Sequence, residues 1–292
     1  MTEEIQTPYR GRIAPSPTGY LHLGHALTFR TAYQRALDSN GKLILRVEDL
    51  DRDRCRAEFR DAITEDLQWF GIRWDEGPGI GGAFAPYVQS ERRAFYLEAW
   101  ENLRAGGFIY PCSCSRRDVQ DAIAAPHQGE EEPVYPGFCR PPEGSISDAK
   151  EPGGIAWRFR VPQGEIVEFD DARLGPQKAV AGADFGDFVI WRKDDIPAYQ
   201  LSVVVDDIAM HITEVVRGED LLTSTFRQLL LYRALGAKSP AFYHCPLVTD
   251  ENGRRLAKRS ASLSLRTLRE SGADPAKLCA INPSSGGRWL LH

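Results

Sequence analysis

One stretch near the N-terminus, Arg12–His25, constrains the fold more than any other, and its sequence is RIAPSPTGYLHLGH. The short run Gly11–Ala14 predicts a buried strand, and two prolines with Gly19 predict a turn into an amphipathic helix near His25. A strand, a turn and a helix N-terminus form an anion site, because unpaired N–H groups and the positive helix end meet there. His22 and His25 are three residues apart, so both can donate to phosphate oxygens from one helix face. A metal half-site or two surface histidines are the alternatives.

A second apolar run, Gly41–Glu48, predicts another buried strand, and it ends in the acidic sequence EDLD. With the helix between them, the two strands predict a βαβ unit with a right-handed crossover and a parallel sheet. Ligands of such sheets bind at the carboxyl ends of the strands, where Arg12, Ser16 and Glu48 fall. The acidic cluster on its own is typical of a solvated turn.

Apolar spacing and turn residues predict the other elements. Two helices are expected, one with Phe59, Ile63, Leu67 and Phe70 before Gly71, and one capped by Ser90 with Ala94, Leu97, Trp100 and Leu103. A third helix is expected to be capped near Ser224. Strands are predicted at 155–161, 188–191 and 211–216, the last of which places Arg217 at its carboxyl end. The segment 196–207 is ambiguous, since its run Val203–Val205 favours a strand.

Composition limits the class of protein. A chain of 292 residues with 42% hydrophobic residues suggests two domains, or one domain with a large insertion. No apolar run approaches the ~20 residues that span a membrane. The N-terminus does not resemble a signal peptide, and six cysteines are too few for a secreted disulfide scaffold. We therefore expect a cytoplasmic protein. A net charge of −5 gives no indication of nucleic-acid binding, although a local basic patch can bind tRNA.

Cysteines cluster in a segment rich in proline and glycine, from about 108 to 186. Cys112, Cys114 and Cys139 can supply three ligands of a tetrahedral zinc site. The fourth ligand is His127 or Tyr135, and general ligand chemistry favours His127. Such a zinc ion would have a structural role in a segment with little core. Three unrelated reduced thiols are the alternative.

A basic loop, Asn252–Arg259, lies near the C-terminus with the sequence NGRRLAKR. A loop that begins with glycine and carries several cations suits a polyphosphate, because point charges on a mobile backbone can follow a leaving group. On its own the same loop is also typical of a solvated surface.

Together these motifs resemble the class I aminoacyl-tRNA synthetases of the glutamyl type. Their first signature, R-x-A-P-S-P-T-G-x-L-H-x-G-H, matches Arg12–His25. Their second, K-M-S-K-S, corresponds to Arg255–Arg259: Lys258 is retained, whereas Arg255 and Ala257 replace a lysine and a serine. The E-D-x-D strand end, the P-A-Y-Q segment and the V-R-G-E-D-L segment also match. The resemblance covers residues 10 to about 270 and favours a helix for the ambiguous segment 196–207.

The resemblance implies an α/β fold: a Rossmann-type doubly wound parallel sheet with a zinc-containing insertion and a short helical C-terminal part. Residues 1–107 would form the first half of the nucleotide-binding fold and 108–186 an acceptor-binding-like insertion with the zinc knuckle. Residues 187–240 would form the second half, and 241–292 the C-terminal part with the second signature.

Full-length glutamyl-tRNA synthetases continue into a large helical anticodon-binding part, for which this sequence has no room after Arg259. The shorter glutamyl-Q tRNA(Asp) synthetases carry a C-x-C…Y-x3-C knuckle, which matches here and implies Tyr135 as the fourth zinc ligand. Enzymes of that group activate glutamate with ATP and Mg²⁺ in the absence of tRNA. They then attach it to the queuosine base of tRNA(Asp), and we expect a monomer. A shortened glutamyl-tRNA synthetase that charges a tRNA 3′ end, or a non-catalytic paralogue, are the alternatives.

The resemblance also assigns site residues. Catalysis would fall to His22, His25 and Lys258. Glutamate has two carboxylates and one ammonium group, which suits two arginine forks and one carboxylate. The glutamate site would comprise Arg12, Ile13, Ala14, Pro15, Ser16, Glu48, Tyr199 and Arg217. The ATP site would comprise His22, Gly24, His25, Arg255, Leu256, Ala257, Lys258 and Arg259.

Overall fold

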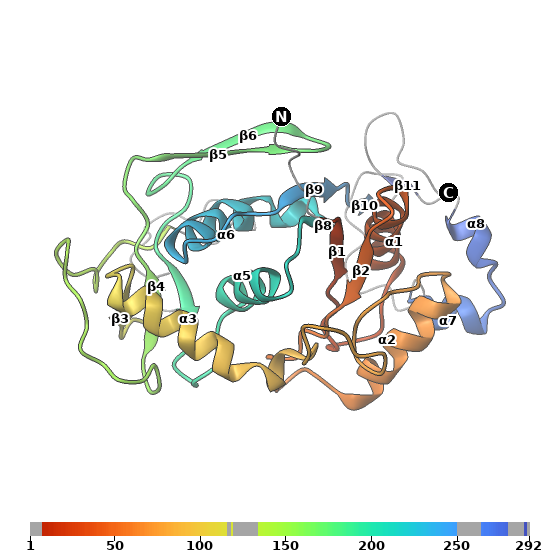
Figure 1. Ribbon diagram of the computed structural model, residues 1–292, viewed down its shortest axis with the longest axis horizontal. Helices are drawn as coiled ribbons and strands as arrows, with labels where there is room; N and C mark the ends of the chain where they lie inside the picture. Colours follow the sequence, from red (N-terminus) through yellow and green to blue (C-terminus); the bar gives the residue numbers. More distant parts are fainter. Residues whose placement is uncertain (1–7, 116–117, 119–133, 250–263, 280–288, 291–292) are drawn as a thin grey trace, which may run out of the picture.

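The computed structural model describes residues 8–115, 118, 134–249, 264–279 and 289–290. Its main sheet has six strands in the order β2-β1-β8-β9-β5-β6, and a second sheet has the order β3-β4-β7 (Figure 1). No helix in the described ranges is long and apolar enough to cross a membrane. The fold is therefore a mixed, largely parallel sheet with helices around it, as the sequence predicts.

The first βαβ unit is confirmed. β1 (Arg10–Ile13) and β2 (Lys42–Leu45) are parallel, and α1 (Leu23–Asp38) connects them. The second unit runs from β8 (Glu214–Gly218) through α6 (Leu222–Ala234) to β9 (Ala241–Cys245), again with parallel strands. The chain therefore leaves β1 toward one edge of the sheet and β8 toward the other. The switch point of the sheet lies between β1 and β8, and ligands of open α/β sheets bind there.

Segments of the predicted insertion contribute to both sheets. β3 (Ile109–Cys112), β4 (Ala156–Phe159) and β7 (Phe188–Trp191) form the small antiparallel sheet. A hairpin that the sequence did not predict, β5 (Ile166–Asp171) with β6 (Gly175–Val180), pairs with β9 and extends the main sheet (Figure 1). The predicted division of the chain at 108, 187 and 241 stays a prediction.

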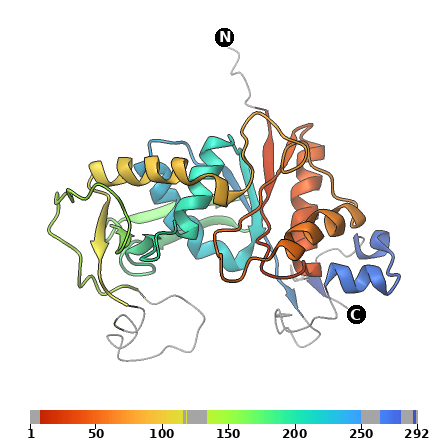
Figure 2. The ribbon, with the colours of Figure 1, turned by 90° about the horizontal axis from the view of Figure 1, so that it is seen from below.

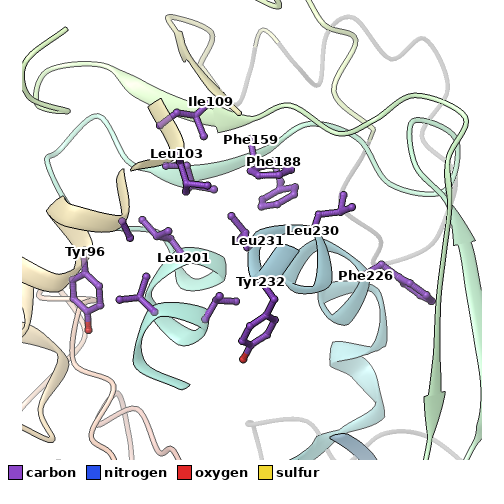
Figure 3. Packing of buried hydrophobic residues seen from close by; sticks show 14 of the residues in the cluster. Tyr96, Leu103, Ile109, Phe159, Phe188, Leu201, Phe226, Leu230, Leu231 and Tyr232 are labelled. Atoms are coloured by element: carbon purple, nitrogen blue, oxygen red, sulfur yellow. The ribbon is translucent and has the colours of Figure 1, made fainter. Parts of the chain in front are cut away.

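The ambiguous segment forms a helix, α5 (Tyr199–Ala209). The run Val203–Val205 is buried, and α5 packs against α6 and against α3 (Arg93–Ala105). Figure 3 shows Leu201 of α5 among side chains of these neighbours, such as Leu103 and Leu231. A β-branched residue costs a helix at most about 0.7 kcal/mol relative to alanine, whereas burying such a side chain contributes about 1.5–3 kcal/mol. Tertiary packing therefore overrides the local preference.

Two predicted helix caps are wrong, because the hydroxyls have other partners. Ser90 lies in the short 3₁₀ helix Gln89–Glu91, and its Oγ donates to Asp49 Oδ2 at 2.7 Å. α3 begins only at Arg93, so its buried face contains Tyr96 and Ala99, and Ala94 is exposed. Ser224 lies within α6, and its hydroxyl accepts a hydrogen bond of 3.0 Å from Gln200.

The C-terminal helices pack beside the first unit. α7 (Leu265–Glu270) contacts α2 (Ala57–Trp69), and α8 (Pro275–Cys279) follows a break that the sequence predicts at Ser271–Pro275 (Figure 2). Arg269 Nη1 of α7 lies 3.4 Å from the buried Asp66 of α2. A short strand pair, β10 (Val248–Thr249) with β11 (Trp289–Leu290), was not predicted from the sequence.

A buried arginine links β2 to α5. Arg46 is 0% exposed, and its Nη1 donates to Asp207 at 2.7 Å, whereas its Nη2 donates to Glu48 at 2.9 Å. Asp206 lies 3.7 Å from Arg46 Nε and accepts from Arg92 at 2.6 Å. Burial would lower the pKa of Arg46, but the carboxylates of Asp207, Glu48 and Asp206 raise it well above its ordinary value. The positive charge of Arg46 therefore compensates the buried negative charges of these carboxylates.

We predict that Arg46→Met destabilises the protein by about 3–5 kcal/mol, since it leaves buried carboxylates without their counter-charge. The control is Arg192→Met, which removes the exposed pair with Asp194 and should cost less than about 1 kcal/mol. Urea unfolding monitored by tryptophan fluorescence measures both. Equal losses in the two variants would contradict the role of Arg46.

Candidate active site

Two arginines stand at the carboxyl ends of the strands that flank the switch point. Arg12 belongs to β1 and Arg217 to β8, and both are buried. Arg12 Nη1 donates to the carbonyl oxygen of Val216 at 3.1 Å, and its Nε lies 3.5 Å from Asp207 Oδ1. Arg12 is therefore attached to the neighbouring strand and shares a carboxylate with Arg46.

Arg217 has a different environment, because the partners of its guanidinium are uncharged. Nη1 donates to Gln228 at 2.8 Å and Nη2 to Thr225 at 2.7 Å. Nε donates to the ring of His244 at 3.3 Å. Burial lowers the pKa of Arg217, whereas a side-chain hydrogen bond with Tyr199, which is 38% exposed at the start of α5, and the carboxylate of Asp207 raise it.

Glu48 lies just beyond the end of β2, and its carboxylate accepts from Arg46. Its backbone N–H donates to the carbonyl of Pro15 at 3.0 Å, which attaches this strand end to the first signature. Burial raises the pKa of Glu48, and Arg46 and Arg12 oppose that rise. The structure thus brings together Arg12, Glu48 and the first signature, as the sequence predicts.

The first signature forms the expected strand, turn and helix. Ile13 and Pro15 are buried, Ala14 is partly buried and Ser16 is exposed. His22 precedes α1 in an extended conformation, and the rings of His22 and His25 are stacked with their centroids 3.7 Å apart. A Cβ at Gly24 would lie 3.4 Å from both His22 and Val248, which is ordinary van der Waals contact, so Gly24 packs directly between them.

The second signature, Arg255–Arg259 with Lys258, lies outside the described residues, as does His127. Their predicted roles stay predictions.

Three thiols and one phenol gather at the end of the small sheet. The Sγ atoms of Cys112, Cys114 and Cys139 all lie within 4.8 Å of one another. The Tyr135 hydroxyl lies 3.4 Å from the sulfur of Cys112 and 3.3 Å from that of Cys114. Ligand atoms about 2.0–2.3 Å from a tetrahedral zinc are separated by about 3.5–3.8 Å. The four side chains therefore fit a zinc ion.

The polar residues behind Arg217 are not predicted from the sequence. His244 of β9 is fully buried, and its Nδ1 lies 2.7 Å from Asp171 Oδ2 at the end of β5. Its Nε2 lies 3.0 Å from Thr225 Oγ1. Because these residues come from separate segments, the only sequence signal was a histidine next to apolar strand residues, a common pattern.

Comparison with known proteins defines the class. Residues 8–282 match the family described as tRNA synthetases class I (E and Q), catalytic domain. The chain belongs to this family, and it is an enzyme of the ligase class.

Individual relatives narrow the assignment. A glutamyl-Q tRNA(Asp) synthetase of Nitratidesulfovibrio vulgaris is 48% identical, over 92% of this chain and 83% of the relative. Glutamate–tRNA ligase 2 of Nitrosococcus oceani is 41% identical, over 94% of this chain but 58% of the relative. The crystal structure of a glutamate tRNA ligase from Elizabethkingia meningosepticum, in complex with its amino acid, superposes with a TM-score of 0.79 at 28% identity. The match covers 98% of this chain and 63% of that structure. The chain is therefore of the glutamyl-tRNA synthetase type.

We predict that His244 makes the stability of the protein depend on pH in a defined direction. Burial and the nearby Arg217 lower the pKa of His244 from 6.5 to about 4. Between these values the unfolded chain binds a proton that the folded chain does not, so stability present above pH 6.5 is lost as the pH falls toward 4. The loss attributable to this ring is roughly 3 kcal/mol.

The measurement is urea unfolding of the wild type and of His244→Gln between pH 7 and pH 4. The variant has no ionisable group at this position, so the free energy of unfolding should fall more steeply for the wild type. Parallel pH profiles would contradict a neutral, buried His244.

Proposed function

We propose that this protein activates L-glutamate with ATP in the absence of tRNA and transfers it to the queuosine base in the anticodon of tRNA(Asp). The environment of Arg217 is the observation that supports glutamate as the amino acid. The guanidinium is buried, and its hydrogen-bond partners in the described structure are uncharged. A buried charge without a counter-charge is costly. The site is therefore suited to an anionic ligand that compensates it.

Glutamate fits the proposed pocket by charge. Arg12 and Arg217 would each bind one carboxylate through guanidinium N–H groups, and Glu48 would bind the ammonium group. Tyr199 and Ser16 are exposed residues, and their hydroxyls can add hydrogen bonds. Glutamine would be discriminated against, because its neutral amide leaves a buried guanidinium without a counter-charge.

The proposed chemistry needs no general base, since a carboxylate is already a nucleophile. The α-carboxylate oxygen of glutamate attacks the α-phosphorus of ATP, the bond to the bridging oxygen breaks, and pyrophosphate leaves. Catalysis then depends on positioning and on neutralising the phosphates. His22 and His25 at the start of α1, with Lys258, would hold the phosphates, and Mg²⁺ bound to ATP would supply further charge neutralisation.

The proposal that queuosine accepts the glutamate is based on the similarity of this chain to its relatives. The glutamyl-Q tRNA(Asp) synthetase is the more similar relative and matches over 83% of its length, against 58% for the glutamate–tRNA ligase. A hydroxyl oxygen of queuosine would attack the carbonyl carbon of glutamyl-adenylate, lose its proton and release AMP. We further propose that the enzyme acts in the cytoplasm as a monomer.

Zinc is the proposed structural metal, with Cys112, Cys114, Tyr135 and Cys139 as its ligands. When bound, zinc would cross-link the segment after β3 to the turn that contains Tyr135 and Cys139. The buried Arg158 supports a site of negative charge, because its Nε donates to Cys112 Sγ at 3.2 Å and its guanidinium stacks 3.8 Å from the Tyr135 ring.

We predict about one zinc ion per chain in the purified protein, by elemental analysis. Cys139→Ser should reduce the zinc content and lower the melting temperature by several degrees, because a structural zinc site contributes folding free energy. Cys55→Ser is the control, since that thiol lies away from the cluster, and it should retain the metal. Equal zinc contents in the two variants would contradict the site.

The test of the proposed acceptor is attachment of labelled glutamate to tRNA(Asp) from queuosine-replete and queuosine-deficient cells. We predict label in the replete tRNA alone, and it should persist when the 3′-terminal adenosine is removed. Equal labelling of both tRNAs, lost on removal of that adenosine, would show a 3′-end acceptor instead. Absence of glutamate-dependent ATP–pyrophosphate exchange would show a non-catalytic paralogue.

A further inference from the structure

We propose that His244 and Asp171 are positioning residues of the glutamate site. Asp171 fixes the tautomer of the imidazole, and the imidazole orients the Arg217 guanidinium through an uncharged acceptor. This inference rests on the proposed function, in which Arg217 binds a carboxylate of glutamate.

Asp171 is a fully engaged carboxylate at the end of β5. Its Oδ1 accepts from the backbone N–H groups of Arg173 at 3.0 Å and Leu174 at 2.8 Å. Its Oδ2 accepts from the backbone N–H of His244 at 3.0 Å and faces the ring Nδ1 at 2.7 Å. Burial alone would raise the pKa of Asp171, but these donors hold it below its ordinary value. The carboxylate is therefore a fixed anion behind the ring.

The tautomer of His244 follows from its neighbours. Arg217 can only donate, so the ring Nε2 that faces its Nε at 3.3 Å must be an acceptor. Thr225 Oγ1 accepts from Arg217 and lies 3.0 Å from the same ring nitrogen and 3.4 Å from the Leu221 carbonyl oxygen, to either of which it can donate. The carboxylate of Asp171 can only accept from the Nδ1 that it faces at 2.7 Å. The single ring proton therefore lies on Nδ1 and is donated to Asp171. Burial and Arg217 lower the pKa of His244 to about 4, so the ring is neutral near pH 7.

The hydrogen bonds of Arg217 determine what it can offer a substrate. A guanidinium has five N–H groups in one plane. His244, Thr225 and Gln228 take one each, at Nε, Nη2 and Nη1. One N–H remains on each terminal nitrogen, and these are available to Tyr199 and to a carboxylate. Three bonds to different elements also fix the plane, which sets the direction in which a carboxylate is bound.

An uncharged partner preserves the charge of Arg217. A carboxylate in the place of His244 would form an ion pair and reduce the attraction for glutamate, whereas an imidazolium would repel the guanidinium. A neutral ring orients Arg217 without either effect. Asp171 lies at the end of a hairpin whose strand β5 pairs with β9 at Asp171 and Phe242. The hairpin that the sequence did not predict thus supports the glutamate site.

Two variants of His244 separate the two hydrogen bonds of the ring. The amide of His244→Asn can keep the donor to Asp171, but it removes the acceptor for Arg217. The longer His244→Gln places an amide oxygen near the position of Nε2 and so keeps the acceptor. Glutamate-dependent ATP–pyrophosphate exchange gives KM values for both substrates.

We predict that His244→Asn raises the KM for glutamate roughly 10-fold or more, because one hydrogen bond to a charged group is lost. The KM for ATP should change less than about 2-fold, and His244→Gln should recover most of the loss. In an Arg217→Ala background, His244→Asn should add less than about 2-fold to the glutamate KM, because it acts through Arg217. Equal losses in His244→Asn and His244→Gln would overturn the proposal.

The single variant Arg217→Ala distinguishes a failure of the proposed function of Arg217 from a failure of the positioning role of His244. If it raises the KM for glutamate and for ATP equally, the proposed function of Arg217 fails. If it raises the KM for glutamate alone while His244→Asn behaves as the wild type, the positioning role fails and the proposed function stands.

A second readout does not depend on activity. Nitrogen-15 NMR of labelled histidine in the wild type should show the ring of His244 with its proton on Nδ1, assigned by comparison with His244→Gln. In Asp171→Asn, an amide NH₂ that faces the ring would move the proton to Nε2 and raise the KM for glutamate as His244→Asn does. A wild-type ring protonated on Nε2 would overturn the proposal even if His244→Asn and Asp171→Asn failed to fold.

Discussion

The buried guanidinium of Arg46 is the interaction on which the rest of the structure depends. It joins the strand that leads to Glu48 with the helix that carries Asp206 and Asp207. Asp207 in turn lies beside Arg12, so one arginine sets the distance between the first βαβ unit and α5. Because burying a charge is costly unless it is paired, these elements have little freedom to shift. The candidate active site therefore lies on elements that buried ion pairs join.

The two arginines at the switch point, Arg12 and Arg217, differ in the charge of their partners. Arg12 shares Asp207 with Arg46, whereas Arg217 contacts the neutral groups of Thr225, Gln228 and His244. The first arrangement joins β1, β8 and α5, and the second leaves a positive charge that the proposed substrate would compensate. The proposed activation of glutamate would need both, because it depends on placing charged groups rather than on a base.

Local sequence patterns predicted which helices and strands form better than they predicted where the helices begin or which strands pair. The strand, turn and helix of the first signature follow from their own residues, and the burial of Ile63 and Leu67 follows from helical spacing. Ser90 and Ser224 failed as helix caps because their hydroxyls bond residues far away in the chain, Asp49 and Gln200. The hairpin Ile166–Val180 was missed because its register depends on β9, which follows it by more than sixty residues.

By itself the sequence predicted which side chains would carry the proposed chemistry: two arginines and a glutamate at strand ends, a histidine pair before a helix, and the cysteines with one tyrosine. These could be predicted because each lies within a local motif whose geometry its neighbours impose. Only the tertiary structure decided how Arg217 is held, since its partners come from α6, β9 and, through His244, from β5. The physical reason is that a buried polar group must be satisfied where it lies, and the chain supplies those partners from distant segments.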